Sequence, residues 1–290
     1  MGRGYIKKRK LSVFSYFFIL SCVVLTTVFV FKELGIRESF EDILYQKDYE
    51  GNIEQENKYY IKKIKDEFGI NISYGDNSKS FISSIDANVQ YDEIIINNNL
   101  KIMYNALRKY PSDVFSIFKN ENYNLYIMLV SNFNDNNLAL ASKNTLNQYR
   151  IYLSNSENFE RSFHHEFFHV LEYYMEGKVK YLYHSWNSYN PYGYEYQSDV
   201  SLLTDEYVYS KFNTEDENRN TYFLTKYSKV SEKEDRAEMF AELMTLNKKE
   251  GYLKNGTNIK SKISYLLNEI HENISISDFY FTTYVNWITT

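Results

Sequence analysis

Apolar residues recur every three or four positions in several stretches of this chain, which is the spacing of one face of an α-helix. The pattern predicts helices over residues 59–68, 94–110, 158–175, 233–246 and 258–271, and a shorter helical stretch over 113–119. Pro111 is placed to end the second helix, and Gly177 to end the third. Much of the chain is therefore helical.

Two other segments have the composition of β-strands. Residues 123–131 (YNLYIMLVS) are rich in strand-forming residues, and residues 149–154 (YRIYLS) alternate between apolar and polar positions. The helix at 158–175 follows the second strand after a short connection that contains helix-capping residue types. No repeat and no boundary is visible between residues 60 and 290. The pattern predicts one α+β domain with a small sheet.

The N-terminal segment differs from the rest of the chain. Basic residues at positions 3 and 7–10 precede an uncharged, mostly apolar run at 11–31, and about twenty such residues cross a bilayer as a helix. We therefore predict a basic tail at 1–10, a transmembrane signal anchor at 11–31, a stalk at 32–58 and a catalytic domain at 59–290. The positive-inside rule then places the N-terminus in the cytoplasm and the domain outside the cell, as a single-pass protein of the cell membrane.

Two other interpretations of the N-terminal segment stay open. A cleaved signal peptide would need a small-x-small site after the apolar run, and the sequence has none there. The sequence around Cys22, the only cysteine, faintly resembles a lipidation site. Apolar sequence continues beyond this residue to Phe31, however, where a lipoprotein would become polar. With no other cysteine, the outer domain contains no disulfide. The net charge of −5 and a pI near 5.7 exclude a strong basic field for binding nucleic acid.

The sequence His165-Glu166-Phe167-Phe168-His169 carries the clearest chemical signal. On a helix, His165 and His169 lie on one face and can bind the same cation. Glu166 can lie beside that cation as a base. Catalytic zinc needs protein ligands, an open position for water and a group that takes the proton of the water. The motif therefore predicts a site for one Zn²⁺ per chain.

A third ligand is expected from the helix at 233–246. Glu238 and Glu242 interrupt an otherwise apolar stretch, and buried carboxylates are costly unless they are paired or bound to a cation. We predict that Glu238 is the ligand and that Glu242 accepts the free N–H of a ligand histidine. The alternative is that both acids form the solvent-exposed edge of this helix. Glu206 and Asp199 are the other acidic candidates for the third ligand.

The remaining polar residues near the motif have less specific roles. Glu172 lies on the face of the histidine pair but too far along the axis to join it, so we expect a supporting role behind the ligands, or a plain solvated carboxylate. His164 points about 100° away from His165 and is expected to be packed or solvated. His184 and His271 are isolated. The aromatic segment 181–197 is either an ordinary surface loop or a wall of the substrate cleft.

Taken together, the two blocks at 164–173 and 234–244 resemble gluzincin metallopeptidases related to the catalytic domain of anthrax lethal factor. The segment Trp186-Asn187, with Asn190-Pro191, is similar to a loop in predicted zinc peptidases of low-GC Gram-positive bacteria. The resemblance implies a zincin-like α+β domain with a small mixed sheet. It also implies an oxyanion-stabilising tyrosine before the last ligand, which matches Tyr227, with Tyr222 as a near alternative.

These observations predict a membrane-anchored extracellular zinc endopeptidase that acts on a peptide or protein substrate. An extended substrate could pair with an edge strand of the sheet, for which residues 123–131 are one candidate. A catalytically inactive surface protein or sensor with the same fold is the alternative from another class. A zincin fold acting on cell-wall material is a third. The sequence does not predict an oligomeric state.

Overall fold

A computed structural model of the protein describes residues 52–120, 123–135, 137–145, 147–180, 182–197, 222–245 and 257–274. The predicted basic tail, the membrane anchor and residues 32–51 of the predicted stalk lie outside these residues. The chain divides into the units Met1–Gly51 and Asn52–Thr290, so the second unit begins a few residues before the predicted position 59. Within the residues described, no helix is both long and apolar enough to cross a membrane.

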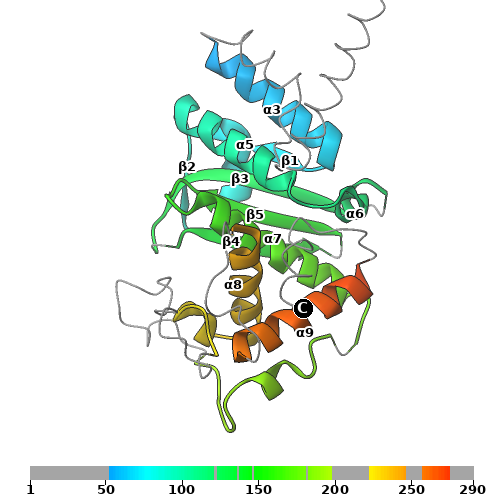
Figure 1. Cartoon of the computed structure of the whole chain (residues 1–290). Coiled ribbons are helices and arrows are strands. Elements are labelled where there is room, and N and C mark those ends of the chain that lie inside the picture. Colours follow the sequence, from blue (N-terminus) through cyan, green and yellow to red (C-terminus); the bar gives the residue numbers. More distant parts are fainter. Residues whose placement is uncertain are drawn as a thin grey trace, which may run out of the picture. The chain divides into compact units, whose positions relative to one another are not determined.

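A mixed five-stranded sheet forms the centre of the second unit (Figure 1). Its strands are β1 (Asn71–Ser73), β2 (Ala87–Val89), β3 (Asn124–Phe133), β4 (Ala139–Thr145) and β5 (Gln148–Ser154). The order is β1-β3-β5-β4, and β2 pairs with the C-terminal end of β3. Strands β1 and β5 run parallel to β3, whereas β2 is antiparallel to β3 and β4 is antiparallel to β5.

Strand β3 is central because it pairs with β1 and with β5, its neighbours on either side in the sheet order, and both of its faces are apolar. Leu125, Ile127 and Leu129 join the main core with the helices, whereas Met128 and Val130 join a smaller core on the other face. Burial of both faces is typical of a strand in the interior of a sheet. The prediction that residues 123–131 form an edge strand is therefore wrong, and the edge beside the metal-motif helix is β4.

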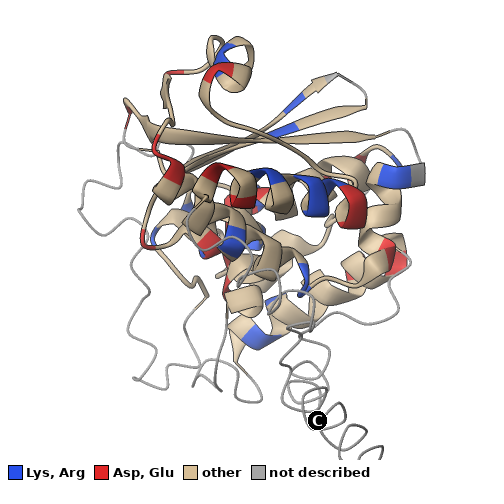
Figure 2. Ribbon diagram, turned by 90° about the horizontal axis from the view of Figure 1, so that it is seen from above, with Lys and Arg blue, Asp and Glu red and all other residues tan. Residues whose placement is uncertain are grey.

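The predicted helices are all present, with ends that differ by a few residues. The longer ones are α3 (Ile53–Phe68), α5 (Glu93–Leu107), α7 (Phe159–Glu176), α8 (Glu232–Thr245) and α9 (Asn258–Asn273). The predicted short stretch at 113–119 is formed by the 3₁₀ turn η2 (Ser112–Phe115) and the helix α6 (Ser116–Asn120). The structure also contains the short helix α4 (Lys79–Ile82) and the 3₁₀ turns η1 (Gly75–Ser78), η3 (Trp186–Tyr189) and η5 (Tyr227–Lys229). Charged residues gather on the helices, and the strands carry few (Figure 2).

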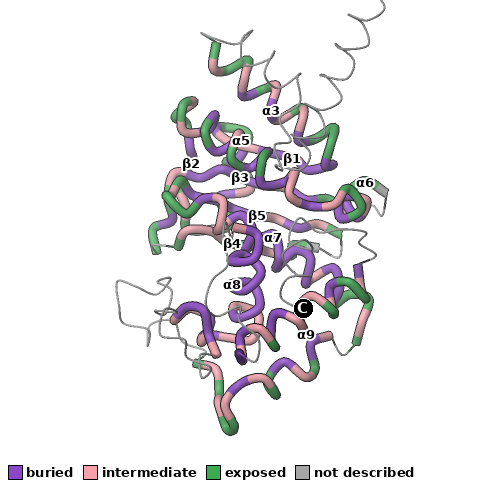
Figure 3. The backbone as a smooth tube through the Cα atoms, viewed as in Figure 1, coloured by how far each residue is buried: buried purple, intermediate pink, exposed green. Residues whose placement is uncertain are grey.

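Helices α7 and α8 lie on the β4 side of the sheet, and α3 and α5 lie toward β1 (Figure 1). Both α7 and α8 are buried along most of their length (Figure 3). Aromatic contacts fix the position of α7: the ring centroids of its Phe168 and of Phe240 in α8 are 5.0 Å apart. The ring centroid of Tyr110, which follows α5, lies 4.8 Å from that of Phe167 in α7. Polar groups held between these two helices are therefore in fixed positions.

Candidate metal centre

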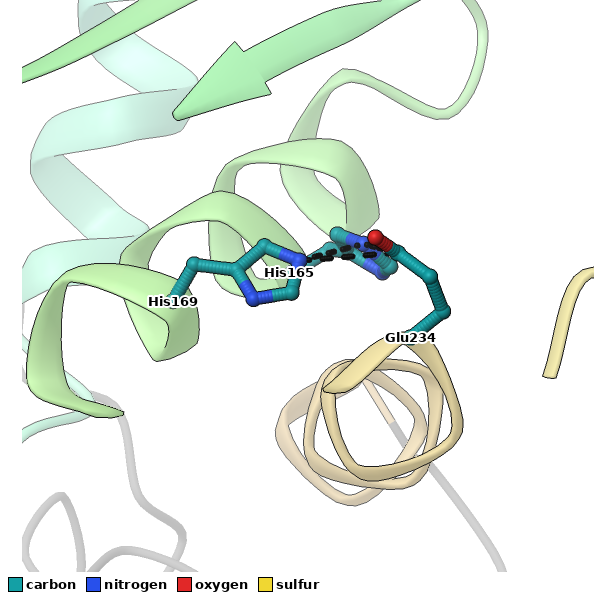
Figure 4. A group of neighbouring side chains, drawn as sticks. All are labelled: His165, His169 and Glu234. Carbon is teal, nitrogen blue, oxygen red and sulfur yellow. Dashed lines mark hydrogen bonds and ion pairs between the residues drawn. The ribbon is translucent and has the colours of Figure 1, made fainter. Parts of the chain in front are cut away.

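His165 and His169 lie one turn apart on the buried side of α7, and both rings point toward the first turn of α8 (Figure 4). Their Nε2 atoms are 3.2 Å apart. Two neutral imidazoles that turn their lone pairs toward each other would repel, so this arrangement needs a proton or a cation between them. The local sequence produces the pair directly, because residues i and i+4 on a helix share one face.

Glu234, in the first turn of α8, completes a group of three ligand atoms. Its Oε2 lies 2.9 Å from Nε2 of His165 and 3.5 Å from Nε2 of His169, and all three atoms lie within 4.8 Å of one another (Figure 4). Tetrahedral ligands at the zinc distances of 2.0–2.1 Å stand about 3.3 Å apart. The three observed separations of 3.2, 2.9 and 3.5 Å lie around that value, so the donor set is of the size that a zinc ion needs.

The electrostatics of this group also suit a cation. Burial by itself would raise the pKa of Glu234, yet its hydrogen bonds with the two histidines lower it below the usual range. Burial would lower the pKa of the histidines, but their carboxylate neighbours raise the pKa of His165 to about 9 and that of His169 to about 10. The surrounding carboxylates thus stabilise positive charge at this position.

Glu238 lies behind the histidines, in a different place from the one predicted for it. Its Oε1 accepts a hydrogen bond from Nδ1 of His165 at 3.0 Å, on the side of the ring away from the ligand group. Both of its oxygens are also bound by Arg161, at 2.9 and 2.8 Å, and Oε2 accepts from the hydroxyl of Thr225 at 2.7 Å. The carboxylate is saturated by these contacts, and the acid whose oxygen groups with the two histidine nitrogens is Glu234, one turn earlier.

Glu238 therefore occupies the position expected for Glu242, that of the acceptor for a ligand histidine. Glu242 lies nearby, with Oε2 4.0 Å from Nε of Arg161. Glu172 is fully buried: its Oε1 accepts from Nε of Arg236 at 2.7 Å, and its Oε2 lies 3.9 Å from Nδ1 of His169. It is placed behind the second histidine, in the supporting position expected from its helical phase.

A cavity of about 250 Å³ opens beside the ligand group. Its lining includes Glu166, His165, Tyr227 and Glu238 from the predicted site, and Leu138 and Ala139 at the start of the edge strand. The backbone N–H of Ala141 donates to the carboxyl group of Glu166. Burial raises the pKa of Glu166, against the opposing effect of the two histidines. The predicted base and the predicted oxyanion donor thus face the same space.

Other residues singled out in the sequence lie away from the ligand atoms. His164 is fully buried and its Nδ1 lies 2.7 Å from the hydroxyl of Tyr110, whereas His184 and His271 are exposed. The backbone carbonyl of Tyr222 accepts from Nζ of Lys262 at 2.9 Å, and Tyr222 does not line the cavity. The alternatives Glu206 and Asp199 lie outside the described residues.

The aromatic segment packs against α8 around Asp235 and Arg236. Trp186 is completely buried, and its indole N–H lies 3.1 Å from Oδ2 of Asp235, which also accepts from the hydroxyl of Tyr196 at 2.8 Å. Lys262 of α9 binds the same oxygen at 2.7 Å. None of the described residues 182–197 lines the cavity. The segment is an internal support of α8.

Three residues around the ligand group were not singled out from the sequence: Glu234, Arg161 and Arg236. A signal for Glu234 exists, since it lies one turn before Glu238 and therefore on the same helical face. Its charged neighbours in the sequence EKEDR give no sign that it is partly buried. Arg161 precedes His165 by one turn, but nothing in the sequence indicates which acid it would bind.

No family model matches this sequence, and no curated protein matches it. A crystal structure of a proposed zinc-binding metallo-peptidase from Bacteroides caccae is similar, with 14% identity and a TM-score of 0.43. The match covers 78% of this chain and 88% of that chain. The resemblance to the lethal factor-related gluzincins stays a prediction, and the chemistry of the centre follows from its own residues.

Proposed function

We propose that the chain is a zinc-dependent endopeptidase in which His165, His169 and Glu234 hold one zinc ion. The convergence of these three ligand atoms, beside the carboxyl group of Glu166, carries the proposal. Zinc bound there would polarise the substrate carbonyl and lower the pKa of a water molecule. This assignment moves the third ligand from Glu238 to Glu234.

Glu166 is the general base and then the general acid. Its carboxylate takes a proton from the attacking water and passes it to the nitrogen of the leaving amine. The raised pKa that burial gives this carboxyl group supports the second step, because proton donation is easier when the acid is not too strong. The N–H of Ala141 fixes the carboxyl group against the edge strand.

Tyr227 stabilises the developing oxyanion. It comes from the turn η5, lines the cavity, and its ring centroid is 5.9 Å from that of His165. A phenol placed beside the scissile carbonyl can donate a hydrogen bond that strengthens as negative charge develops on the oxygen. Tyr222, the alternative in the sequence, does not line this cavity.

The substrate is proposed to bind as an extended peptide along β4. This strand ends the sheet order on the side of α7, and it pairs only with β5 among the described strands. An exposed strand edge supplies backbone hydrogen bonds that do not depend on the side chains of the peptide. The contact of Ala141 with Glu166 would bring a peptide on this edge close to the base.

Zinc content and peptide cleavage together test the proposed function. The purified chain should contain one zinc ion, cleave members of a broad peptide library, and lose cleavage when a chelator removes the metal. A chain that binds zinc but cleaves no peptide would instead be the inactive binding protein. Cleavage of cell-wall polymer without cleavage of peptide would indicate the third function considered above.

The cellular location is a separate proposal that rests on residues 1–31 of the sequence. The basic cluster before the apolar run supports a cytoplasmic N-terminus and an extracellular catalytic domain. Protease added to intact cells should then degrade the domain, and a chain that lacks residues 1–31 should be released from the membrane. A domain that is protected until the cells are lysed would contradict the proposed topology.

A further inference from the structure

Two arginine–carboxylate pairs of opposite direction connect α7 and α8 on either side of the metal ligands. In the first, Arg161 of α7 binds Glu238 of α8 through both terminal nitrogens, at 2.9 and 2.8 Å. In the second, Arg236 of α8 binds Glu172 of α7 through Nε at 2.7 Å. Each helix therefore contributes one arginine and one glutamate.

Each carboxylate also faces the outer nitrogen of one ligand histidine. Oε1 of Glu238 lies 3.0 Å from Nδ1 of His165. Oε2 of Glu172 lies 3.9 Å from Nδ1 of His169. The two pairs thus extend from an arginine, through a carboxylate, to a histidine whose Nε2 belongs to the ligand group.

We infer that Arg161 and Arg236 are positioning residues that build the zinc site before the metal binds. Arg161 fixes the carboxylate that orients His165, and Arg236 fixes the carboxylate that lies behind His169. Neither arginine is a metal ligand in this account, and Arg161 also lines the cavity beside His165. The inference rests on the proposed function, because it takes the group of His165, His169 and Glu234 as the metal site.

Burial and charge explain why the arginines are needed. The Glu238 side chain is 1% exposed and the Glu172 side chain is fully buried. An ionised carboxylate in such a place is costly unless a cation pairs with it. Without its arginine, each glutamate would lose its cationic partner, because the histidine that it faces must stay neutral to bind zinc.

The geometry of the first pair determines which oxygen faces the histidine. The planar guanidinium of Arg161 binds both oxygens of Glu238 and so fixes the plane of the carboxylate. The hydroxyl of Thr225 donates to Oε2 at 2.7 Å, which directs Oε1 toward His165. A lysine cannot reproduce this, because an ammonium group acts as a point charge.

The second pair is held from behind by the aromatic segment. The guanidinium carbon of Arg236 lies 4.4 Å from the ring centroid of Tyr183 and 5.6 Å from that of Trp186. The carboxylate of Glu172 lies 3.9 Å from Nδ1 of His169, whereas that of Glu238 lies 3.0 Å from Nδ1 of His165. We therefore expect the larger effect on zinc affinity from Arg161, and the segment 182–197 to act on the site through Arg236.

The test compares zinc affinity and melting temperature in variants of the full-length chain. Arg161→Gln should weaken zinc binding by about 10- to 100-fold in competition with a fluorescent chelator, which is the usual effect of removing such support. Arg161→Lys should give an intermediate affinity, and Arg236→Lys a smaller loss than Arg161→Gln. Glu176→Gln is the matched control, because Glu176 pairs with Lys233 across the same two helices at 2.7 Å but contacts no ligand histidine.

Melting with and without zinc separates positioning from general stability. Positioning predicts that the stabilisation by zinc shrinks in Arg161→Gln, since that stabilisation follows the affinity. Equal losses of melting temperature in both states, with wild-type zinc affinity, would overturn the inference. If Arg161→Gln does not fold, Arg161→Lys decides: unchanged affinity there overturns it as well. A wild-type chain that binds no zinc would instead overturn the proposed function.

Discussion

The two sides of helix α8 both bury carboxylates, but they do so in different ways. On the side that contacts α9, Oδ2 of Asp235 accepts hydrogen bonds from Lys262, Tyr196 and Trp186. On the side toward α7, Glu234 faces two histidine nitrogens that turn lone pairs toward the same point.

The difference shows how a structural acid can be told from a candidate ligand. Asp235 and Glu238 each meet a cationic side chain, so the structure itself compensates their charge. Glu234 has no lysine or arginine among its described ion-pair partners, and its side chain is 21% exposed at the rim of the site. Burial alone therefore does not identify a candidate metal ligand. The charge of the side chains that contact the carboxylate distinguishes a structural acid from a candidate ligand.

The largest expected effect separates chemistry from binding on the α7 side. Glu166→Gln keeps the size of the side chain and its contact with Ala141, but it removes the base. Peptide cleavage should fall by at least about a hundredfold, the lower end of what general-base catalysis supplies. Zinc content and melting temperature should stay close to those of the wild type. Cleavage at the wild-type rate with normal zinc content would refute the mechanism.

The opposite result is expected on the other side of α8. Asp235→Asn leaves Lys262 fully buried without its counterion, and breaking such a pair typically costs about 3–5 kcal/mol of stability. The melting temperature should fall markedly, whereas folded protein should still bind one zinc ion per chain. Thermal unfolding and a zinc titration of the same preparation measure both effects. A selective loss of zinc without loss of stability would erase the contrast between the two sides.

A smaller effect is expected at Tyr227. Tyr227→Phe removes the proposed oxyanion donor, so kcat should fall by on the order of tenfold to a hundredfold with little change in KM. Tyr222→Phe is the matched control and should cleave peptide at the wild-type rate, because only the backbone carbonyl of Tyr222 makes the described contact with Lys262. Steady-state kinetics on one good peptide would distinguish the two tyrosines, and a loss confined to Tyr222→Phe would reverse the assignment.

Local patterns predicted the helices and the first half of the site. His165, Glu166 and His169 follow from one helix, because their relative positions depend only on its 3.6-residue period. Strand β4, with the sequence ALASKNT, was missed because it has few strand-forming residues and owes its structure to pairing with β5. The central position of β3 was also missed, since pairing on both sides is a property of the whole sheet.

The choice between Glu234 and Glu238 could not be made from the sequence. The two residues lie one turn apart on the same face of α8, so their helical phase is nearly the same. The apolar surroundings of Glu238 correctly indicated burial, but the partner that compensates its charge is Arg161, which lies 77 positions away in the sequence. Only the packing of α7 against α8 distinguishes the carboxylate that binds an arginine from the carboxylate that is left for the metal.

A zinc titration of Glu234→Gln beside Glu238→Gln tests the central claim most directly. Glu234→Gln removes a ligand and should lose stoichiometric zinc, while its metal-free form stays folded. Glu238→Gln keeps all three ligand atoms and should still bind one zinc ion per chain, with weaker affinity because His165 loses its carboxylate. Full zinc occupancy in Glu234→Gln, together with loss of zinc in Glu238→Gln, would contradict the account.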